Sequence, residues 1–180
     1  MKIAVSIDSA CDLPQEIIKE NNIFCMPYFV NMGEEEFRDG VNVTSADLFK
    51  YVKEKGVLPK TGAPSAEMFK EYFEDILKSY DAVIHIGLSD KMTSAFANAK
   101  VGAEGMQNVY LVDSMSLSSG IALLTLKCVQ KVNEGKAPEQ IVQELNDLRP
   151  YVQASFLVDT LKYLYKGGRC SSLALIGATL

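Results

Sequence analysis

Hydroxyl side chains gather at three places where an apolar stretch of this chain ends and a helix is expected to begin. The three segments are residues 8–14 (DSACDLP), 60–65 (KTGAPS) and 88–94 (LSDKMTS). Backbone N–H groups at a helix start, together with Ser or Thr hydroxyls, form a small surface that binds anions. Ser and Thr also cap helices, which explains most of their occurrences at any single helix start. Because three such segments occur in one short chain, the pattern predicts a site for a carboxylate or a phosphate.

Residues that would support catalysis are few. His85 is the only histidine, and it lies in the apolar stretch 83–86 (VIHI), which is typical of a core histidine. The sequence therefore offers few residues that could form a metal-binding site or a catalytic Ser–His pair. Asp8 follows an apolar strand, as in aspartyl phosphotransferases, but Ala10 stands where those enzymes need a second acid. Asp8 and Asp12 could hold Mg²⁺, although two acids around a turn more often act as cap and turn residues.

The composition excludes several classes of protein. The chain has 180 residues, 48% of them apolar, which is enough for one core and part of another. Its net charge of −5, without a stripe of Lys or Arg, argues against a nucleic-acid partner. The four cysteines are far apart, as in reduced intracellular proteins. The apolar stretch at the start is too short for a signal peptide, and no stretch is long enough to span a membrane. We therefore expect a cytoplasmic protein that is not embedded in a membrane.

Strand-like and helix-like segments alternate along the chain. Continuous apolar stretches predict buried strands at 3–7, 82–87 and 109–112, and Pro27 moves a strand at 23–30 toward an edge. Residues 151–158 are also strand-like. Helices are predicted at 14–21, 44–56, 65–77, 94–107, 116–134, 137–148 and 160–166. This alternation predicts an α/β fold with a doubly wound, mostly parallel sheet.

Polar side chains follow three of the predicted strands. The pairs are Asp8-Ser9, Leu88-Ser89 and Asp113-Ser114. Ligands of doubly wound sheets bind outside the carboxyl ends of the strands. We therefore expect these three strand ends to converge on one crevice.

The motifs of this chain, and the order in which they occur, resemble those of the DegV family of bacterial fatty acid-binding proteins. Residues 8–14 resemble its D-S-T-x-D-L-P, and residues 60–65 match its K-T-S-Q-P-S. Residues 88–99 follow its L-S-S-x-L-S-G-T-Y-x-S-A, residues 112–114 fit a V-D-S segment, and residues 164–169 (LYKGGR) match L-x-K-G-G-R. The motifs run in order over the whole chain, which makes the resemblance far more specific than any one of them.

The resemblance implies a Rossmann-like amino-terminal domain over residues 1–150, with residues 151–180 beginning a second α/β domain. It implies that a long-chain fatty acid lies between the domains as a ligand, with no cofactor, no metal and no catalytic residue. Family members hand the fatty acid to a kinase subunit that makes acyl phosphate, so a fatty acid kinase subunit is the expected partner.

Two hydroxyls correspond to those that hold the carboxylate in the family, namely Thr61 and Thr93. Ser94 and Ala95 stand where the family motif has Gly and Thr, so the head-group segment differs from the family pattern. Weaker candidates for the carboxylate site are Ser9, Ser65, Ser94, Ser114 and Arg169.

The carboxyl-terminal stretch, residues 173–180 (LALIGATL), is apolar to its last residue. Such an end needs burial, so we expect the chain to be part of a longer protein, or to pack on a partner or on a second copy in a homo-oligomer. The alternative is a terminal helix that folds back and packs on its own domain. Two other functions stay open. One is an enzyme of phosphoryl or acyl transfer that uses Asp8 or Asp12, and the other is a protein-interaction domain that docks through this apolar end.

Overall fold

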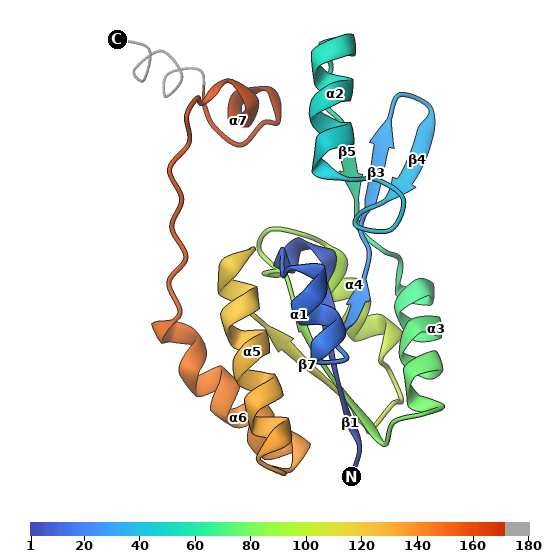
Figure 1. Ribbon diagram of the computed structural model, residues 1–180. Coiled ribbons are helices and arrows are strands. Elements are labelled where there is room, and N and C mark those ends of the chain that lie inside the picture. The colour runs from blue at the N-terminus through green and yellow to red at the C-terminus, as the bar shows by residue number, and fades with distance from the viewer. Residues whose placement is uncertain (172–180) are drawn as a thin grey trace. The chain divides into compact units, whose positions relative to one another are not determined.

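The computed structural model describes residues 1–171, which divide between two compact units (Figure 1). Unit 1 comprises residues 1–29 and 62–154, and unit 2 comprises 30–61 and the segment from 155 onward. The expected boundary at residue 150 lies near the passage from unit 1 to unit 2, but residues 30–61 also belong to unit 2. The division into domains 1–150 and 151–180 stays a prediction. The apolar end, 173–180, lies outside the described residues.

Unit 1 is built on a four-stranded sheet in which every neighbouring pair is parallel. Its strands are β1 (Ile3–Asp8), β2 (Phe24–Met26), β6 (Ala82–Gly87) and β7 (Val109–Asp113), in the order β2-β1-β6-β7. The predicted α/β fold with a parallel sheet is confirmed. From β1 the chain moves to β2 on one side and later to β6 on the other, so the topological switch point lies between β1 and β6.

Helices cover both faces of this sheet (Figure 1). One face carries α1 (Gln15–Glu20), α5 (Ser119–Asn133) and α6 (Pro138–Leu148), and the other carries α3 (Ala66–Leu77) and α4 (Ala95–Gly102). Short 3₁₀ turns follow β1 and α6, at η1 (Ser9–Cys11) and η2 (Arg149–Tyr151). Helices α3, α4, α5 and α6 bury apolar residues against the sheet, and α1 contributes the partly buried Ile18, so the sheet is enclosed on both sides, as parallel sheets require.

Side-chain alternation along β1 separates an apolar face from a polar one. Val5 and Ile7 join the core beneath α5 and α6. Ser6 and Asp8 alternate with them and are also buried, and the Ser6 hydroxyl bonds to Tyr72 of α3. The sheet therefore carries buried polar groups on the side of α3 and α4.

Helices α3 and α4 pack closely because α4 ends in a glycine. A Cβ added at Gly102 would lie 2.6 Å from the carbonyl oxygen of Ala66 and 2.8 Å from Cβ of Phe69. Gly105, at φ 81°, follows in a conformation that L side chains rarely adopt. The helix predicted at 94–107 therefore ends at Gly102, where its backbone meets α3.

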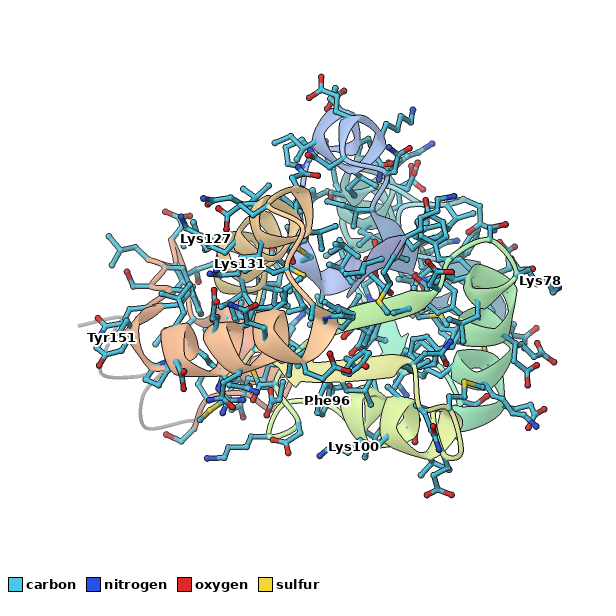
Figure 2. All side chains as sticks on the ribbon, turned by 90° about the horizontal axis from the view of Figure 1, so that it is seen from below. Lys78, Phe96, Lys100, Lys127, Lys131 and Tyr151 are labelled. Carbon is cyan, nitrogen blue, oxygen red and sulfur yellow. The ribbon has the colours of Figure 1, made fainter. Side chains whose placement is uncertain are left out.

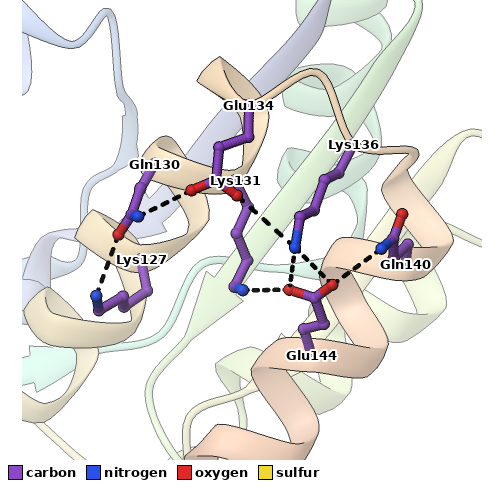
Figure 3. Close-up of polar contacts among 7 residues, drawn as sticks. All are labelled: Lys127, Gln130, Lys131, Glu134, Lys136, Gln140 and Glu144. Atoms are coloured by element: carbon purple, nitrogen blue, oxygen red, sulfur yellow. Dashed lines mark hydrogen bonds and ion pairs between the residues drawn. The ribbon is translucent and has the colours of Figure 1, made fainter.

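A cluster of charged groups joins α5 to α6 (Figure 3). The carboxylate of Glu144 accepts hydrogen bonds from Lys131 of α5 and from Lys136 in the connecting turn, the latter at 2.7 Å. These hydrogen bonds hold the pKa of Glu144 down to about 2. An adjoining cavity of about 450 Å³ is bordered by Lys127, Lys131 and Tyr151. Figure 2 labels these three side chains.

The described residues of unit 2 form a three-stranded sheet and two helices. The strands β3 (Phe29–Met32), β4 (Glu35–Arg38) and β5 (Lys60–Gly62) are ordered β4-β3-β5, and the helices are α2 (Ser45–Lys55) and α7 (Lys162–Lys166). Helix α2 begins as predicted, because Thr44 and Asp47 form a reciprocal capping box. It ends at Gly56, whose φ of 68° closes the helix.

Two predicted strands are wrong. The strand at 23–30 is broken at Pro27 and Tyr28, so that β2 lies at an edge of the parallel sheet and β3 enters the other sheet. The strand predicted at 151–158 does not form, and Phe156 and Leu157 are exposed there. An alternating pattern gives a strand only where a neighbouring strand is present to pair with its backbone.

Candidate functional site

The carboxyl ends of β1, β6 and β7 meet, as the sequence predicts. The Leu88 N–H donates to Oδ2 of Asp8 at 2.8 Å, which joins the ends of β1 and β6. The Ser114 N–H donates to the Gly87 carbonyl at 3.2 Å, which joins the ends of β7 and β6. Two of these strands flank the topological switch point, where ligands of such sheets bind.

Tyr28 connects the loop after β1 to the loop after β6. Its backbone N–H donates to Oγ of Ser9 at 3.1 Å, and its hydroxyl donates to Oγ1 of Thr93 at 3.2 Å. Oγ1 of Thr93 also accepts the Ala95 N–H at 3.2 Å. Burial and the nearby charge of Asp8 raise the pKa of Tyr28, so its hydroxyl keeps its proton. Ser9 and Thr93, two of the predicted site residues, are thus linked through the two ends of Tyr28.

A buried series of polar side chains lies beneath these loops. Nδ1 of His85 lies 2.9 Å from Oγ of Ser6, which lies 2.9 Å from the Tyr72 hydroxyl. Nε2 of His85 lies 3.4 Å from Oδ1 of Asp8. The expectation that the chain has few residues for a Ser–His pair is wrong, because Ser6 and His85 form one. Ser6, His85 and Asp8 are at most 1% exposed, so a substrate cannot reach them, and His85 is the predicted core histidine.

Of three other predicted site residues, two make contacts within their own loops and the third is exposed. Ser65 is exposed and caps α3, where its hydroxyl accepts the Met68 N–H at 3.2 Å. Ser114 is buried, and its hydroxyl both accepts from the Ser116 N–H and donates to the Ser116 carbonyl. Ser94 is exposed beside Thr93. Ser65 and Ser114 therefore have structural partners within their own loops.

The departures from the family pattern at residues 94 and 95 fit the backbone. Ser94 has φ −79° and ψ −9°, a region open to any L residue, so glycine is not needed there. Ala95, the first residue of α4, is fully buried in the core, and its N–H donates to Oγ1 of Thr93. The segment therefore keeps the Thr93 hydroxyl in a defined position.

The remaining two candidates lie in unit 2, where Thr61 and Arg169 line one cavity of about 990 Å³. Residues 56–60 and the turn around Lys166 and Gly167 complete much of its wall. The guanidinium of Arg169 donates to the Gly167 carbonyl at 3.0 Å. Thr61 belongs to unit 2 and Thr93 to unit 1, so their pairing around one carboxylate stays a prediction.

Within residues 1–171, no group of three or more His, Cys, Asp or Glu side chains is placed to hold a metal ion. Over the same part of the chain, every helix is too short or too polar to cross a bilayer.

Sequence reasoning missed Tyr28, which contacts both loops of the site. The signal available was Pro27, because a proline inside an apolar stretch indicates that a strand is interrupted there. Asn98 was also missed. Its side chain donates to the Pro64 carbonyl at 2.7 Å and so ties the segment after Thr61 to α4.

Comparison with known sequences identifies relatives over the whole chain. A family model described as "Uncharacterised protein, DegV family" matches residues 2–180. A DegV domain-containing protein of Caldanaerobacter subterraneus is 34% identical over 182 residues, which cover 99% of this chain and 65% of that protein. The chain thus spans less than two thirds of the curated relatives that it matches first.

Comparison with solved structures gives the same family. A DegV family protein from Thermus thermophilus, described by its fatty acid binding, matches with a TM-score of 0.86 and 30% identity over 98% of this chain and 64% of that one. DegV of Bacillus subtilis, described as a fatty acid binding protein, matches with a TM-score of 0.84 and 31% identity over the same shares of the two chains.

Proposed function

Since this chain belongs to the DegV family, we propose that it binds a long-chain fatty acid without transforming it and presents it to a fatty acid kinase subunit. The observation that carries the proposal is the convergence of Ser9, Tyr28 and Thr93 at the carboxyl ends of β1 and β6. Hydroxyl groups at a switch point suit a ligand with one anionic end.

The carboxylate is held by hydroxyl donors in this proposal. Thr61 and Thr93 each supply one O–H, and hydrogen bonds to a charged acceptor are about twice as strong as neutral ones. Arg169 lines the same cavity as Thr61, as do Lys60 and Lys166, so a cationic side chain is available there for the carboxylate. Apolar residues of that cavity, among them Val57, Leu58 and Leu164, are suitable neighbours for an acyl chain.

Several features support binding rather than catalysis. Asp8 is 1% exposed and its Oδ2 already accepts the Leu88 N–H, so it is poorly placed to attack a substrate. The buried series of Ser6, His85 and Asp8 has the composition of a hydrolase triad but not its access. We therefore assign the chemistry of acyl phosphate formation to the kinase partner. A cytoplasmic location and association into oligomers remain part of the proposal.

Mass spectrometry of freshly purified, denatured protein tests the ligand, and a bound long-chain fatty acid is the expected result. Titration with oleate then tests the residues. Thr61→Ala and Thr93→Val should each weaken binding about tenfold or more, because each removes a hydrogen bond to a charged group. Thr44→Ala is the matched control, since it removes a capping hydroxyl of α2 outside the site. Oleate affinities equal to the parent in both site variants would contradict the assignment of Thr61 and Thr93.

A further inference from the structure

The hydrogen bonds around Thr93 leave its hydroxyl only one remaining role. Oγ1 accepts from the Tyr28 hydroxyl and from the Ala95 N–H, both at 3.2 Å. A threonine hydroxyl has two acceptor lone pairs and one O–H. Both lone pairs are occupied, so the O–H is the group that remains for a ligand.

We propose that Tyr28 is a positioning residue that makes Thr93 a hydrogen-bond donor, and that this polarity selects an ionised carboxylate over a fatty alcohol. The inference rests on the proposed function, because it takes the ligand of Thr93 to be a fatty acid. A carboxylate only accepts hydrogen bonds, so it matches the Thr93 O–H. An alcohol head group brings an O–H of its own, and the occupied lone pairs of Thr93 cannot receive it.

The surroundings of Tyr28 hold its hydroxyl in this orientation. Its side chain is 9% exposed, and its backbone N–H is anchored on Ser9. Asp8 also acts on the phenol, because its buried Oδ1 accepts no hydrogen bond from the described residues and its charge helps to raise the pKa of Tyr28, so the hydroxyl keeps its proton. In the contact between the two side chains, the Tyr28 O–H donates to Oγ1 of Thr93. Tyr28 therefore acts on the ligand through Thr93 and not by touching it.

The test compares oleate with oleyl alcohol on four variants: Tyr28→Phe, Thr93→Val, the double variant, and Tyr72→Phe. Tyr72→Phe is the matched control, because it also removes a phenol hydroxyl on the same side of the sheet, but one that bonds to Ser6. We expect Tyr28→Phe to weaken oleate binding about threefold to tenfold, the range for loss of one supporting hydrogen bond. Binding of oleyl alcohol should stay the same or improve, so the preference for the carboxylate falls.

The double variant separates positioning from simple loss of packing. Once Thr93→Val has removed the hydroxyl, Tyr28→Phe should cause no further loss of oleate affinity. Tyr72→Phe should lower the melting temperature but leave both affinities unchanged. If Tyr28→Phe does not fold, Thr93→Ser decides, since a serine hydroxyl in contact with Tyr28 should keep the preference that Thr93→Val loses.

Two results would overturn the inference while the proposed function stands. One is an additive effect of Tyr28→Phe and Thr93→Val on oleate binding, and the other is an equal loss for oleate and oleyl alcohol in Tyr28→Phe. A parent protein that binds no oleate would overturn the proposed function itself, and this inference with it.

Discussion

Asp8 and His85 face each other inside the parallel sheet, with Oδ1 of Asp8 3.4 Å from Nε2 of His85 and neither side chain more than 1% exposed. The two side chains come from β1 and β6, the strands on either side of the switch point, and neither of the facing atoms has a hydrogen-bond partner among the described residues. Ser6 bonds the other ring nitrogen, and Phe69 and Phe73 contact the ring edge-on, with centroids 5.5 and 5.6 Å away. This arrangement gives the loops of the candidate site a rigid polar base.

Asp8→Asn should therefore destabilise the protein without removing an activity. Loss of a charged acceptor from the Leu88 N–H costs about 1.5–3 kcal/mol in the free energy of unfolding. Asp12→Asn is the control, because Asp12 is exposed at φ 56°, a conformation that asparagine tolerates. Neither the parent nor the variant should turn over aryl phosphates or ATP with Mg²⁺. Turnover that is present in the parent and lost in Asp8→Asn would instead support the phosphotransferase alternative.

Gly102→Ala should destabilise the protein, although alanine favours helices. The added Cβ would lie 2.6 Å from a backbone oxygen of α3 and 2.9 Å from the backbone nitrogen of Lys70. Overpacking of this kind costs about 1–3 kcal/mol, which exceeds the gain of about 1 kcal/mol from helix propensity. Urea unfolding measures the difference. Ala97→Gly, at an exposed position of α4, isolates the propensity effect. A Gly102→Ala variant as stable as the parent would show that α3 and α4 can separate at little cost.

The ion pairs of Glu144 should contribute stability that depends on pH. Hydrogen bonds from Lys131 and Lys136 lower its pKa from 4.5 to about 2, so its contribution is complete above about pH 4.5 and is lost as the pH falls toward 2. We expect Glu144→Gln to be less stable than the parent at neutral pH and the difference to shrink over that range. Glu74→Gln, at an exposed position of α3, should show no comparable pH-dependent difference. A constant difference from pH 7 to pH 2 would contradict the ion-pair interpretation.

The cysteines should differ in reactivity. Burial raises the pKa of Cys11 to about 11 and that of Cys128 to about 12, whereas Cys25 and Cys170 are only half-buried. Since the thiolate is the reactive form, a disulfide reagent at about pH 8 should modify Cys25 and Cys170 well before Cys11 and Cys128. Peptide mass mapping assigns the sites, and denatured protein provides the control in which all four react. Rapid labelling of Cys128 in the native protein would indicate that α5 opens from the core.

The amino-acid sequence by itself determined those strands and helix ends that are marked by residues close together in the chain. Continuous apolar stretches gave β1, β6 and β7 because a strand buried on both faces has no polar side to alternate with. The capping box at Thr44 and Asp47 marked the start of α2, since its hydrogen bonds join residues only three apart. The order of the motifs indicated the family, and the hydroxyl residue types indicated an anion site.

Only the tertiary structure decided which groups contact one another. Tyr28 and Thr93 are 65 positions apart, and His85 and Ser6 are 79 apart, so no local periodicity reports either contact. The register of β1 against β6 places Ser6 opposite His85, and the break between β2 and β3 leaves Tyr28 outside both strands, where it contacts Thr93. The sequence shows that Thr93 has a hydroxyl. Whether that hydroxyl donates or accepts depends on which neighbours occupy its lone pairs, and folding alone brings those neighbours into place.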